Sequence, residues 1–409
     1  MMQVLVMAHA CYGHNSFFKG NYLFRTWTDA SAIVDYLVFA RKYVAECEER
    51  HGVAAVEQLL DACHALQNHG VDRYKRPSPI SPEEEARRQV ERAEYLQSQV
   101  NLLWRTIPDN SADSGPHSDD EDPLGLHQYG RYPAEPQENL LYFIEKNAPL
   151  LEPWQRELVR IVRKLAQYFY PQRQTQVMNE GWATFWHYTI MNRLYDEGLV
   201  DEGLVLEFLQ SHTAVVSQQG FDSPYFNGIN PYALGFAMFS DIKRICEEPT
   251  AEDREWFPDM AGSDWLETLH FAMRNFKDES FIQQFLSPRV IRDLKLFSLV
   301  DDDQDEMLTI AAIHDDRGYR RVREALSTQY ALSVREPNIQ VWQADIRGDR
   351  SLTLHHVQDR RRPLAKSVYP VLRYLHQLWG FPVKLHSIED DDVVRRYQWP
   401  LPADLEERA

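Results

Sequence analysis

The 409-residue chain has few cysteines and little positive charge. Its four cysteines include no CxxC pair, which excludes a disulfide scaffold and a zinc-finger protein. Lys and Arg number 44 against 62 Asp and Glu, giving a net charge of −18. Because nucleic acids and anionic membranes both require a basic face, this balance excludes partners of either kind as the main ligand. The composition is typical of a soluble, cytoplasmic protein.

The common catalytic signatures are also missing. The sequence has no Walker A motif, no GxGxxG, no GxSxG and no HExxH. These absences exclude the easiest assignments to nucleotide-binding proteins, dinucleotide-binding proteins, serine hydrolases and ordinary zinc peptidases. Any function must therefore be read from less familiar local patterns.

The N-terminal segment is apolar from its first residue to His9, without the basic start or the cleavage site of a signal peptide. It is far shorter than the ~20 residues needed to span a bilayer. Its apolar residues suit a buried helix that lacks an N-cap. We therefore expect the chain to begin inside a helix, and the natural protein or its relatives to carry further sequence upstream.

Most of the chain has helical periodicity and strong helix-capping signals. An acidic segment at 109–136, rich in Asp, Ser, Pro and Gly, predicts a loop or linker. The patterns predict helices at 29–51, 53–66, 81–103, 137–146, 152–170, 174–197, 202–216, 231–247, 263–275 and 288–295.

The period changes after residue 295. Alternating, β-branched segments predict strands at 296–300, 307–314, 339–346, 351–358 and 383–388, with helices at 318–333 and 364–380. The sequence thus predicts an α+β protein. A large α-helical domain over 1–295 precedes a small C-terminal α+β domain over 296–409, whose sheet is mainly antiparallel in the order ββαββαβ.

Two histidines in the apolar N-terminal segment are candidates for chemistry. His9 and His14 are five residues apart, which places them about 140° apart on a regular α-helix. They can converge on one metal only if the helix bends or widens near Gly13. Two interpretations stay open: a metal ion joins the imidazoles, or each hydrogen-bonds to backbone or carboxylate within a polar patch of the core.

A second candidate is Glu180, a lone carboxylate in a strongly aromatic helix, which demands a cation, a hydrogen-bond donor or a metal. His187 follows at i+7, within about 20° of the same helix face but ~10 Å further along. It can therefore be an acid/base in the same cleft or a group that hydrogen-bonds a metal ligand.

The string Asn-Glu-Gly-Trp-Ala at 179–183 is similar to the Asn-Glu-Gly-Phe-Ala segment of gluzincin metallopeptidases, in which the Glu is the third zinc ligand. This chain departs from them because its His spacing is x4 rather than x3 and because Ala10 stands where the catalytic Glu would be. The resemblance implies a divalent metal such as zinc held by His9, His14 and Glu180, with an open fourth position.

Three longer strings carry a wider resemblance: His-Ala-Cys-Tyr-Gly-His-Asn-Ser-Phe-Phe-Lys-Gly-Asn-Tyr at 9–22, Met-Asn-Glu-Gly-Trp-Ala-Thr-Phe-Trp-His at 178–187, and Asn-Pro-Tyr-Ala-Leu-Gly-Phe at 230–236. With them, essentially the whole chain resembles the stage V sporulation protein R (SpoVR) family. The resemblance implies a role in spore cortex (peptidoglycan) formation, or in stationary-phase and stress physiology in non-sporulating bacteria. It also implies neighbours: a PrkA-type serine kinase and a von Willebrand factor A-like protein.

Two functional hypotheses follow. In the first, the protein is a metal-dependent hydrolase of peptide or amide bonds, with His9, His14 and Glu180 as ligands and His187 as catalytic acid/base. In the second, it is a non-enzymatic regulatory or scaffold protein that acts with the kinase and its neighbour, and the same residues are structural.

Overall fold

The structure is a computed structural model. It describes residues 2–74, 87, 132–133, 135–221, 223–297, 299–300, 309–310, 315–346, 348–359, 363–364, 367–390 and 393–401. The predicted helix at 81–103 and the acidic segment at 109–136 lie almost entirely outside these residues. Within them, no helix is both long and apolar enough to cross a bilayer.

Residues 2–74 are mostly helical, and the side chains of Asn21 and Asp29 cap the starts of two of these helices. Asp29 accepts hydrogen bonds from the first backbone N–H groups of α4, and Gly52, at φ 88°, separates α4 from α5. This confirms the predicted helices at 29–51 and 53–66. The elements are α1 (Met2–Val6), the π-helix η1 (Met7–His14), α2 (Asn15–Gly20), α3 (Tyr22–Trp27), α4 (Ala30–His51), α5 (Val53–Ala65) and the 3-10 turn η2 (Gln67–His69).

The middle of the chain is helical, as predicted. Proline at the first helical position begins α8, α11 and α15, where its missing N–H costs nothing. The helices are α7 (Leu140–Asn147), α8 (Pro153–Gln174), α9 (Gln176–Asp196), α10 (Glu202–Val216), α11 (Pro231–Glu247), α12 (Ala251–Trp256), α13 (Trp265–Asn275), α14 (Asp278–Phe285) and α15 (Pro288–Asp293).

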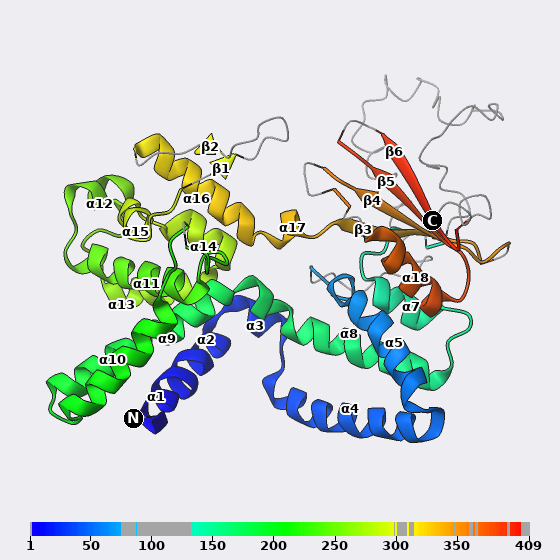
Figure 1. The fold of residues 1–409 in the computed structure, drawn as a ribbon, viewed down its shortest axis with the longest axis horizontal. Coiled ribbons are helices and arrows are strands. Elements are labelled where there is room, and N and C mark those ends of the chain that lie inside the picture. Colours follow the sequence, from blue (N-terminus) through cyan, green and yellow to red (C-terminus); the bar gives the residue numbers. More distant parts are fainter. Residues whose placement is uncertain are drawn as a thin grey trace.

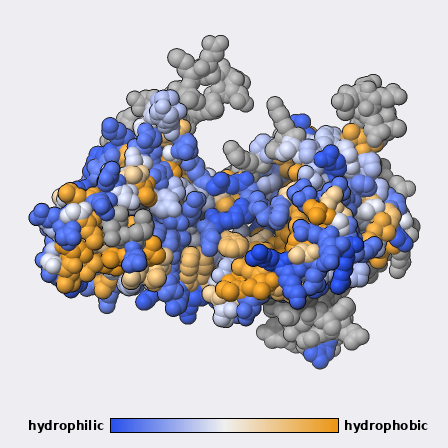
Figure 2. All heavy atoms as spheres, turned by 60° about the horizontal axis from the view of Figure 1, so that its bottom comes forward, coloured by the Kyte–Doolittle hydropathy of each residue, from blue (hydrophilic) through white to orange (hydrophobic). Residues whose placement is uncertain are grey.

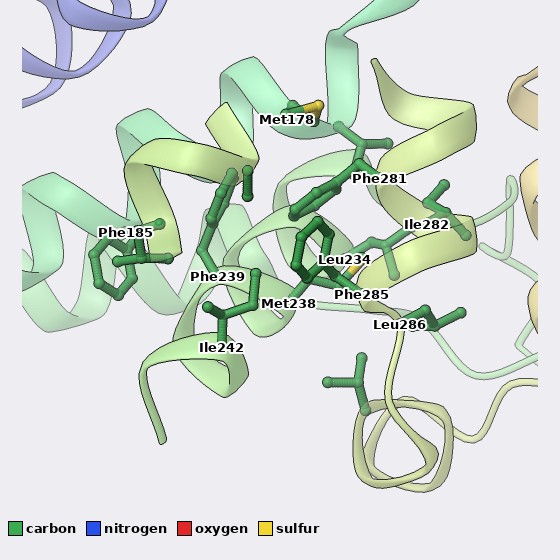
Figure 3. Close-up of a cluster of buried hydrophobic side chains, with 14 of the residues drawn as sticks. Met178, Phe185, Leu234, Met238, Phe239, Ile242, Phe281, Ile282, Phe285 and Leu286 are labelled. Carbon is green, nitrogen blue, oxygen red and sulfur yellow. The ribbon is translucent and has the colours of Figure 1, made fainter. Parts of the chain in front are cut away.

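One hydrophobic cluster surrounds α9 and α11 (Figure 3). Phe239 on α11 packs against Trp182 of α9 on one side and Phe281 of α14 on the other, with ring centroids 5.4 and 4.8 Å apart. α16 (Asp316–Tyr330), followed by the short α17 (Leu332–Arg335), adds Tyr319 and further apolar residues to the same cluster. α9 is thus buried on several sides, which fixes the helix that carries Glu180.

The C-terminal sheet is mixed. Its order is β3 (Asn338–Ala344), β4 (Leu352–Val357), β5 (Val383–Ile388) and β6 (Val394–Trp399). The outer pairs are antiparallel but β4 and β5 are parallel, because α18 (Val368–Trp379) crosses between them. The finer prediction of a mainly antiparallel ββαββαβ sheet is therefore corrected at this pair.

Two further differences concern the strands. β6 was not predicted. It contains two consecutive arginines, so the alternation of apolar and polar residues that indicates a strand is interrupted, as is common in edge strands. β1 (Leu299–Val300) and β2 (Thr309–Ile310) pair only with each other in a separate ladder. The described residues of the first two predicted strands therefore form a ladder of their own and are not part of the main sheet.

A second hydrophobic cluster lies under this sheet. Leu354 and Leu385 of the sheet pack there with Trp379 of α18 and with apolar residues of α4, α5, α7 and α8. Figure 1 shows the arrangement, with α9 to α16 grouped on one side of the molecule and the sheet with α5, α7 and α18 on the other. Both clusters contain residues from before and after position 296, and the domain boundary predicted there stays a prediction.

Candidate metal centre

The helix that carries the histidine pair is widened. η1 is a π-helix, whose backbone hydrogen bonds run from i to i+5, the spacing that separates His9 from His14. The two rings therefore lie on one side of the helix, edge to face with centroids 4.6 Å apart. Their Nε2 atoms are 3.1 Å apart. His9 and His14 therefore converge, which a regular α-helix would not allow. Gly13 lies within the widened segment, as expected.

Glycines bring the elements of the site close together. A Cβ on Gly13 would lie 2.6 Å from Ala183 Cα, so η1 contacts the backbone of α9 there. On another side of α9, a Cβ on Gly235 would lie 2.1 Å from Val177 O and 2.7 Å from Gly181 Cα. α9 is therefore held between η1 and α11 at distances that only glycine permits.

Two consecutive residues of α9 meet His14. Glu180 Oε2 lies 3.6 Å from His14 Nε2, and Asn179 Oδ1 lies 2.9 Å from His14 Nδ1. Since the amide oxygen can only accept, Nδ1–H of His14 donates to it. This contact directs the lone pair of His14 Nε2 toward His9 and Glu180, as a metal ligand requires.

The cluster continues inward through two more histidines. His9 Nδ1 lies 2.9 Å from His187 Nδ1, and His187 Nε2 lies 3.0 Å from Nδ1 of His212 on α10. The predicted His187 thus joins the cluster, but it lies behind His9 with both ring nitrogens bonded and only 5% of its surface exposed. This geometry fits a residue that orients His9.

Burial favours the neutral form of His9, His187 and His212. Burial, with a smaller effect of His14, lowers the pKa of His9 to about 4. Burial and the neighbouring His9 lower the pKa of His187 to about 3, and burial also lowers the pKa of His212. Neutral imidazole is the form that binds metals, so at neutral pH His9 can bind a metal without first losing a proton.

Tyr232 borders Glu180. Its phenol is hydrogen-bonded to this carboxylate, and burial, followed by the negative charge of Glu180, raises the pKa of Tyr232. Asn230 caps α11 by accepting from the backbone N–H of Tyr232. Its side chain also donates to the carbonyls of Val215, in the last turn of α10, and of Ser217, just after that helix. The Asn-Pro-Tyr segment thereby fixes a protonated hydroxyl at the edge of the cluster.

The N-terminus of α9 is anchored by a buried carboxylate from another helix. Asp278 Oδ1 accepts from the backbone N–H of Met178 and Oδ2 from that of Val177, each at 2.9 Å. Complete burial raises the pKa of Asp278 to about 7, although these hydrogen bonds favour the charged form. Asp278 therefore caps the helix one turn before Glu180.

The donor set suits a small divalent cation. One ligand atom each from His9, His14 and Glu180 lie within 4.8 Å of one another. Zinc–nitrogen bonds of ≈2.0–2.1 Å place neighbouring tetrahedral ligands ~3.4 Å apart, close to the 3.1 and 3.6 Å found here. The side chains of His14 and Glu180 are 21% and 19% exposed, which leaves one face of the cluster accessible. Two imidazoles and one carboxylate are the ligands of many catalytic zinc sites.

The structure therefore brings together all four residues singled out in the sequence. Whether they bind a metal, and whether His187 acts in catalysis, stay predictions. Sequence reasoning missed three members: Asn179, Tyr232 and His212. The first two lie within strings that were noted as unusual, whereas His212 is a single histidine in an amphipathic helix and gave no signal.

Comparisons with known proteins complete the description. Residues 1–335 match the family model described as SpoVR like protein, and residues 337–390 match the model described as SpoVR-like C-terminal domain. The chain is 66% identical over 393 residues to the Uncharacterized protein YcgB of Escherichia coli (strain K12), covering 96% of this chain and 75% of that protein. A search of solved structures found no match.

Proposed function

The chain belongs to the SpoVR family, whose two regions cover residues 1–335 and 337–390, and from its His/Glu cluster we propose that this protein is a metal-dependent hydrolase of peptide or amide bonds. One observation carries the proposal: the Nε2 atoms of His9 and His14 and a carboxylate oxygen of Glu180 converge at the spacing of neighbouring zinc ligands. A zinc ion there would supply a Lewis acid for the scissile carbonyl and lower the pKa of a bound water.

The chain's own residues orient this set. Asn179 holds the proton of His14 on Nδ1 and so keeps Nε2 available. If Nε2 of His9 binds the metal, the proton of His9 is on Nδ1, which donates to Nδ1 of His187. The proton of His187 is then on Nε2, which donates to Nδ1 of His212. In this arrangement each ring nitrogen of His9 and His187 has a complementary partner.

Tyr232 is placed to act on the substrate. Its hydroxyl is protonated at neutral pH, and by turning from Glu180 it could donate a hydrogen bond to negative charge that develops on a carbonyl oxygen. Ala10 follows His9 where gluzincins have a glutamate, so the proton of the attacking water needs another acceptor. The acid/base role predicted for His187 stays a prediction, and its place behind His9 supports an orienting role more directly.

The test is metal binding followed by activity. We expect one zinc per chain after reconstitution, measured by elemental analysis, and affinity at least ~100-fold weaker in His14→Ala or Glu180→Gln. His64→Ala, an exposed histidine on α5, is the matched control and should bind like wild type. Absence of stoichiometric metal would overturn the site. If zinc binds but the protein does not cleave a peptide library in a zinc-dependent way, the metal site would stand and the proposed hydrolase reaction would be wrong.

A second candidate, a scaffold for the PrkA-type kinase and the von Willebrand factor A-like protein, is favoured by one surface. α4 exposes four neighbouring apolar side chains, Val34, Leu37, Val38 and Phe39, at 61, 41, 67 and 43%. Figure 2 brings forward the side on which α4 lies in Figure 1 and shows apolar patches there. Such patches are typical of interaction sites.

This candidate has its own experiment. Val38→Glu should reduce copurification of the kinase, whereas Val53→Glu, at a 52% exposed valine of α5, should not. Equal recovery of the kinase with both variants would count against α4 as the contact surface.

Two further expectations stay predictions. One is the process that the resemblance implies, spore cortex formation or stress physiology, and the other is the cytoplasmic location. In the cytoplasm, the substrate would be a protein or a wall precursor rather than mature wall.

A further inference from the structure

A cavity of about 140 Å³ lies between α18, the face of the C-terminal sheet that α18 covers, and the end of α5. It is part of the hydrophobic cluster under the sheet, whereas the histidine cluster borders the other hydrophobic cluster, around α9. An apolar cavity of about 150 Å³ is large enough to admit a benzene ring. The volume therefore suits a ligand of a single ring and is too small for a nucleotide or a peptide.

The sheet and α18 supply a continuous apolar lining. Leu354 of β4 lies directly opposite Leu385 of β5, so both side chains point to the same face of the sheet. Both are at most 3% exposed. The lining residues of α18 recur at three- and four-residue spacing and so form one stripe of that helix: Val368, Val371, Leu372 and Leu375. A ring that enters the cavity is therefore surrounded by aliphatic side chains from two layers of the fold.

One polar side chain distinguishes this lining. His69, in η2, lines the cavity, and its Nδ1 atom is buried with no hydrogen-bond partner among the described residues. Burial, followed by the positive charges of Arg73 and Arg173, lowers the pKa of His69 to about 4, so its ring is neutral at pH 7. Both arginines pair with Glu336. A buried nitrogen without a partner costs free energy, which a ligand with a matching hydrogen-bonding group would recover.

Two exposed lining residues place the opening of the cavity between α5 and α18. They are Ala65, at the end of α5, and Ser367, directly before α18. None of the described residues that line the cavity is charged at neutral pH. An ion would lose its hydration there without gaining a counter-ion, so the lining favours a neutral ligand.

We propose that this cavity binds a small neutral phenol, whose ring packs against Leu354 and Leu385 and whose hydroxyl donates a hydrogen bond to Nδ1 of His69. A neutral imidazole accepts at one of its two nitrogens, as this contact requires. A ring is rigid and so loses little conformational freedom on binding. The ligand would lie between α5 and the C-terminal sheet and stabilise their packing. The site does not depend on the proposed hydrolase activity.

Calorimetric titration of the full chain with phenol, toluene and benzoate tests the proposal. Toluene has nearly the same shape as phenol but no hydroxyl. In a purely apolar cavity toluene would bind more tightly, because the hydroxyl of phenol would be buried without a partner. Since His69 offers that partner, we expect phenol to bind the wild type at least as tightly as toluene. Benzoate should bind more weakly than either, because its charge would be buried unpaired.

His69→Phe keeps a ring at this position and removes its nitrogens. It should weaken phenol binding roughly 10- to 100-fold, the effect of leaving a buried hydroxyl unpaired, and leave toluene binding within about threefold of wild type. His64→Phe, at an exposed histidine of α5, is the matched control and should bind both ligands like wild type.

A second pair of variants tests the location. Val371→Phe places a ring in the cavity and should abolish binding of phenol and toluene, whereas Val53→Phe, at a 52% exposed valine of α5, should leave both unchanged. The proposal is overturned if phenol does not bind at millimolar concentration, if toluene or benzoate binds the wild type more tightly than phenol, or if phenol binding survives Val371→Phe. Equal losses of phenol binding in His69→Phe and His64→Phe would overturn it too.

Discussion

The packing of α9 against α11 offers a sharp test, because the substitution Gly235→Ala has two opposing effects. Alanine is favoured over glycine within a helix by about 1 kcal/mol. The added methyl would however lie 2.1 Å from Val177 O, about 1.3 Å short of the 3.4 Å at which ordinary contact begins. The obstacle is backbone, which cannot rotate away as a side chain tip can. The two helices must therefore separate.

The magnitude follows from comparing these effects. Overpacking a well-packed interior costs typically ~1–3 kcal/mol, and more where only backbone can yield. After the gain in helix propensity, we expect Gly235→Ala to lower the free energy of unfolding by about 2 kcal/mol or more. Glu180 lies one turn from Val177, and metal ligands tolerate displacements of only ~0.5 Å, so zinc affinity should fall as well.

Thermal or urea unfolding measures the first effect and zinc titration the second. Gly203→Ala on α10 is the control, since its methyl would meet only the Asp201 side chain, at 3.3 Å. It should be neutral or slightly stabilising. If Gly235→Ala proved as stable as Gly203→Ala, the close approach of α9 and α11 would be wrong, and with it the argument that this contact fixes Glu180.

Three further predictions concern buried charges and thiols. Asp278 has a folded-state pKa of about 7 against about 4 unfolded, so the native protein keeps a proton that the unfolded chain loses. In urea unfolding, the free energy of unfolding of the wild type should therefore fall by up to ~4 kcal/mol, relative to that of Asp278→Asn, as the pH rises from about 4 to 7. Arg244→Ala should cost ~3–5 kcal/mol in the same assay, because it leaves the buried Asp253 without its two-fold hydrogen-bonded partner. In the native protein a thiol reagent should label the exposed Cys11 first and Cys63 last, because burial raises the pKa of Cys63 to about 12.

Each of these has a control. Asp278→Asn should itself show a flatter pH dependence, and an unchanged profile would refute the assignment. Arg193→Ala breaks an exposed pair with Glu197 and should change stability by less than ~1 kcal/mol. A loss as large as that of Arg244→Ala would contradict the role of burial. Labelling of all four cysteines at one rate would show that their exposure differs from the structure.

The sequence predicted most of the longer helices, because periodicity and caps such as Asp29 act within a few residues, but it missed the short helices α12 and α14. It failed where the outcome depends on distant partners. The parallel pairing of β4 and β5 follows from α18 crossing the sheet, and β1 could be predicted as a strand but not excluded from the main sheet. Local patterns identify elements and do not specify which elements become neighbours.

The candidate site shows the same division. His9, His14 and Glu180 could be singled out, since polar groups in apolar helices demand partners. Their convergence required a π-helix that spacing alone allowed but did not establish. His212 could not be found, because its role comes only from its contact with His187 across two helices. Asn179 lay beside Glu180 in the sequence, yet its bond to His14 appears only once η1 and α9 are packed.

The widened turn of η1 also explains how the His-x4-His spacing of this chain relates to the His-x3-His spacing of ordinary zinc-binding helices. An α-helix bonds i to i+4 and a π-helix bonds i to i+5, so a π-turn accommodates one additional residue without displacing the turns on either side. The His-x4-His pair is therefore geometrically the His-x3-His pair of an ordinary zinc helix with a single insertion. A search for helical metal sites that requires a fixed ligand spacing would pass over every site of this kind, whereas one that permits a one-residue insertion between the histidines would retain them.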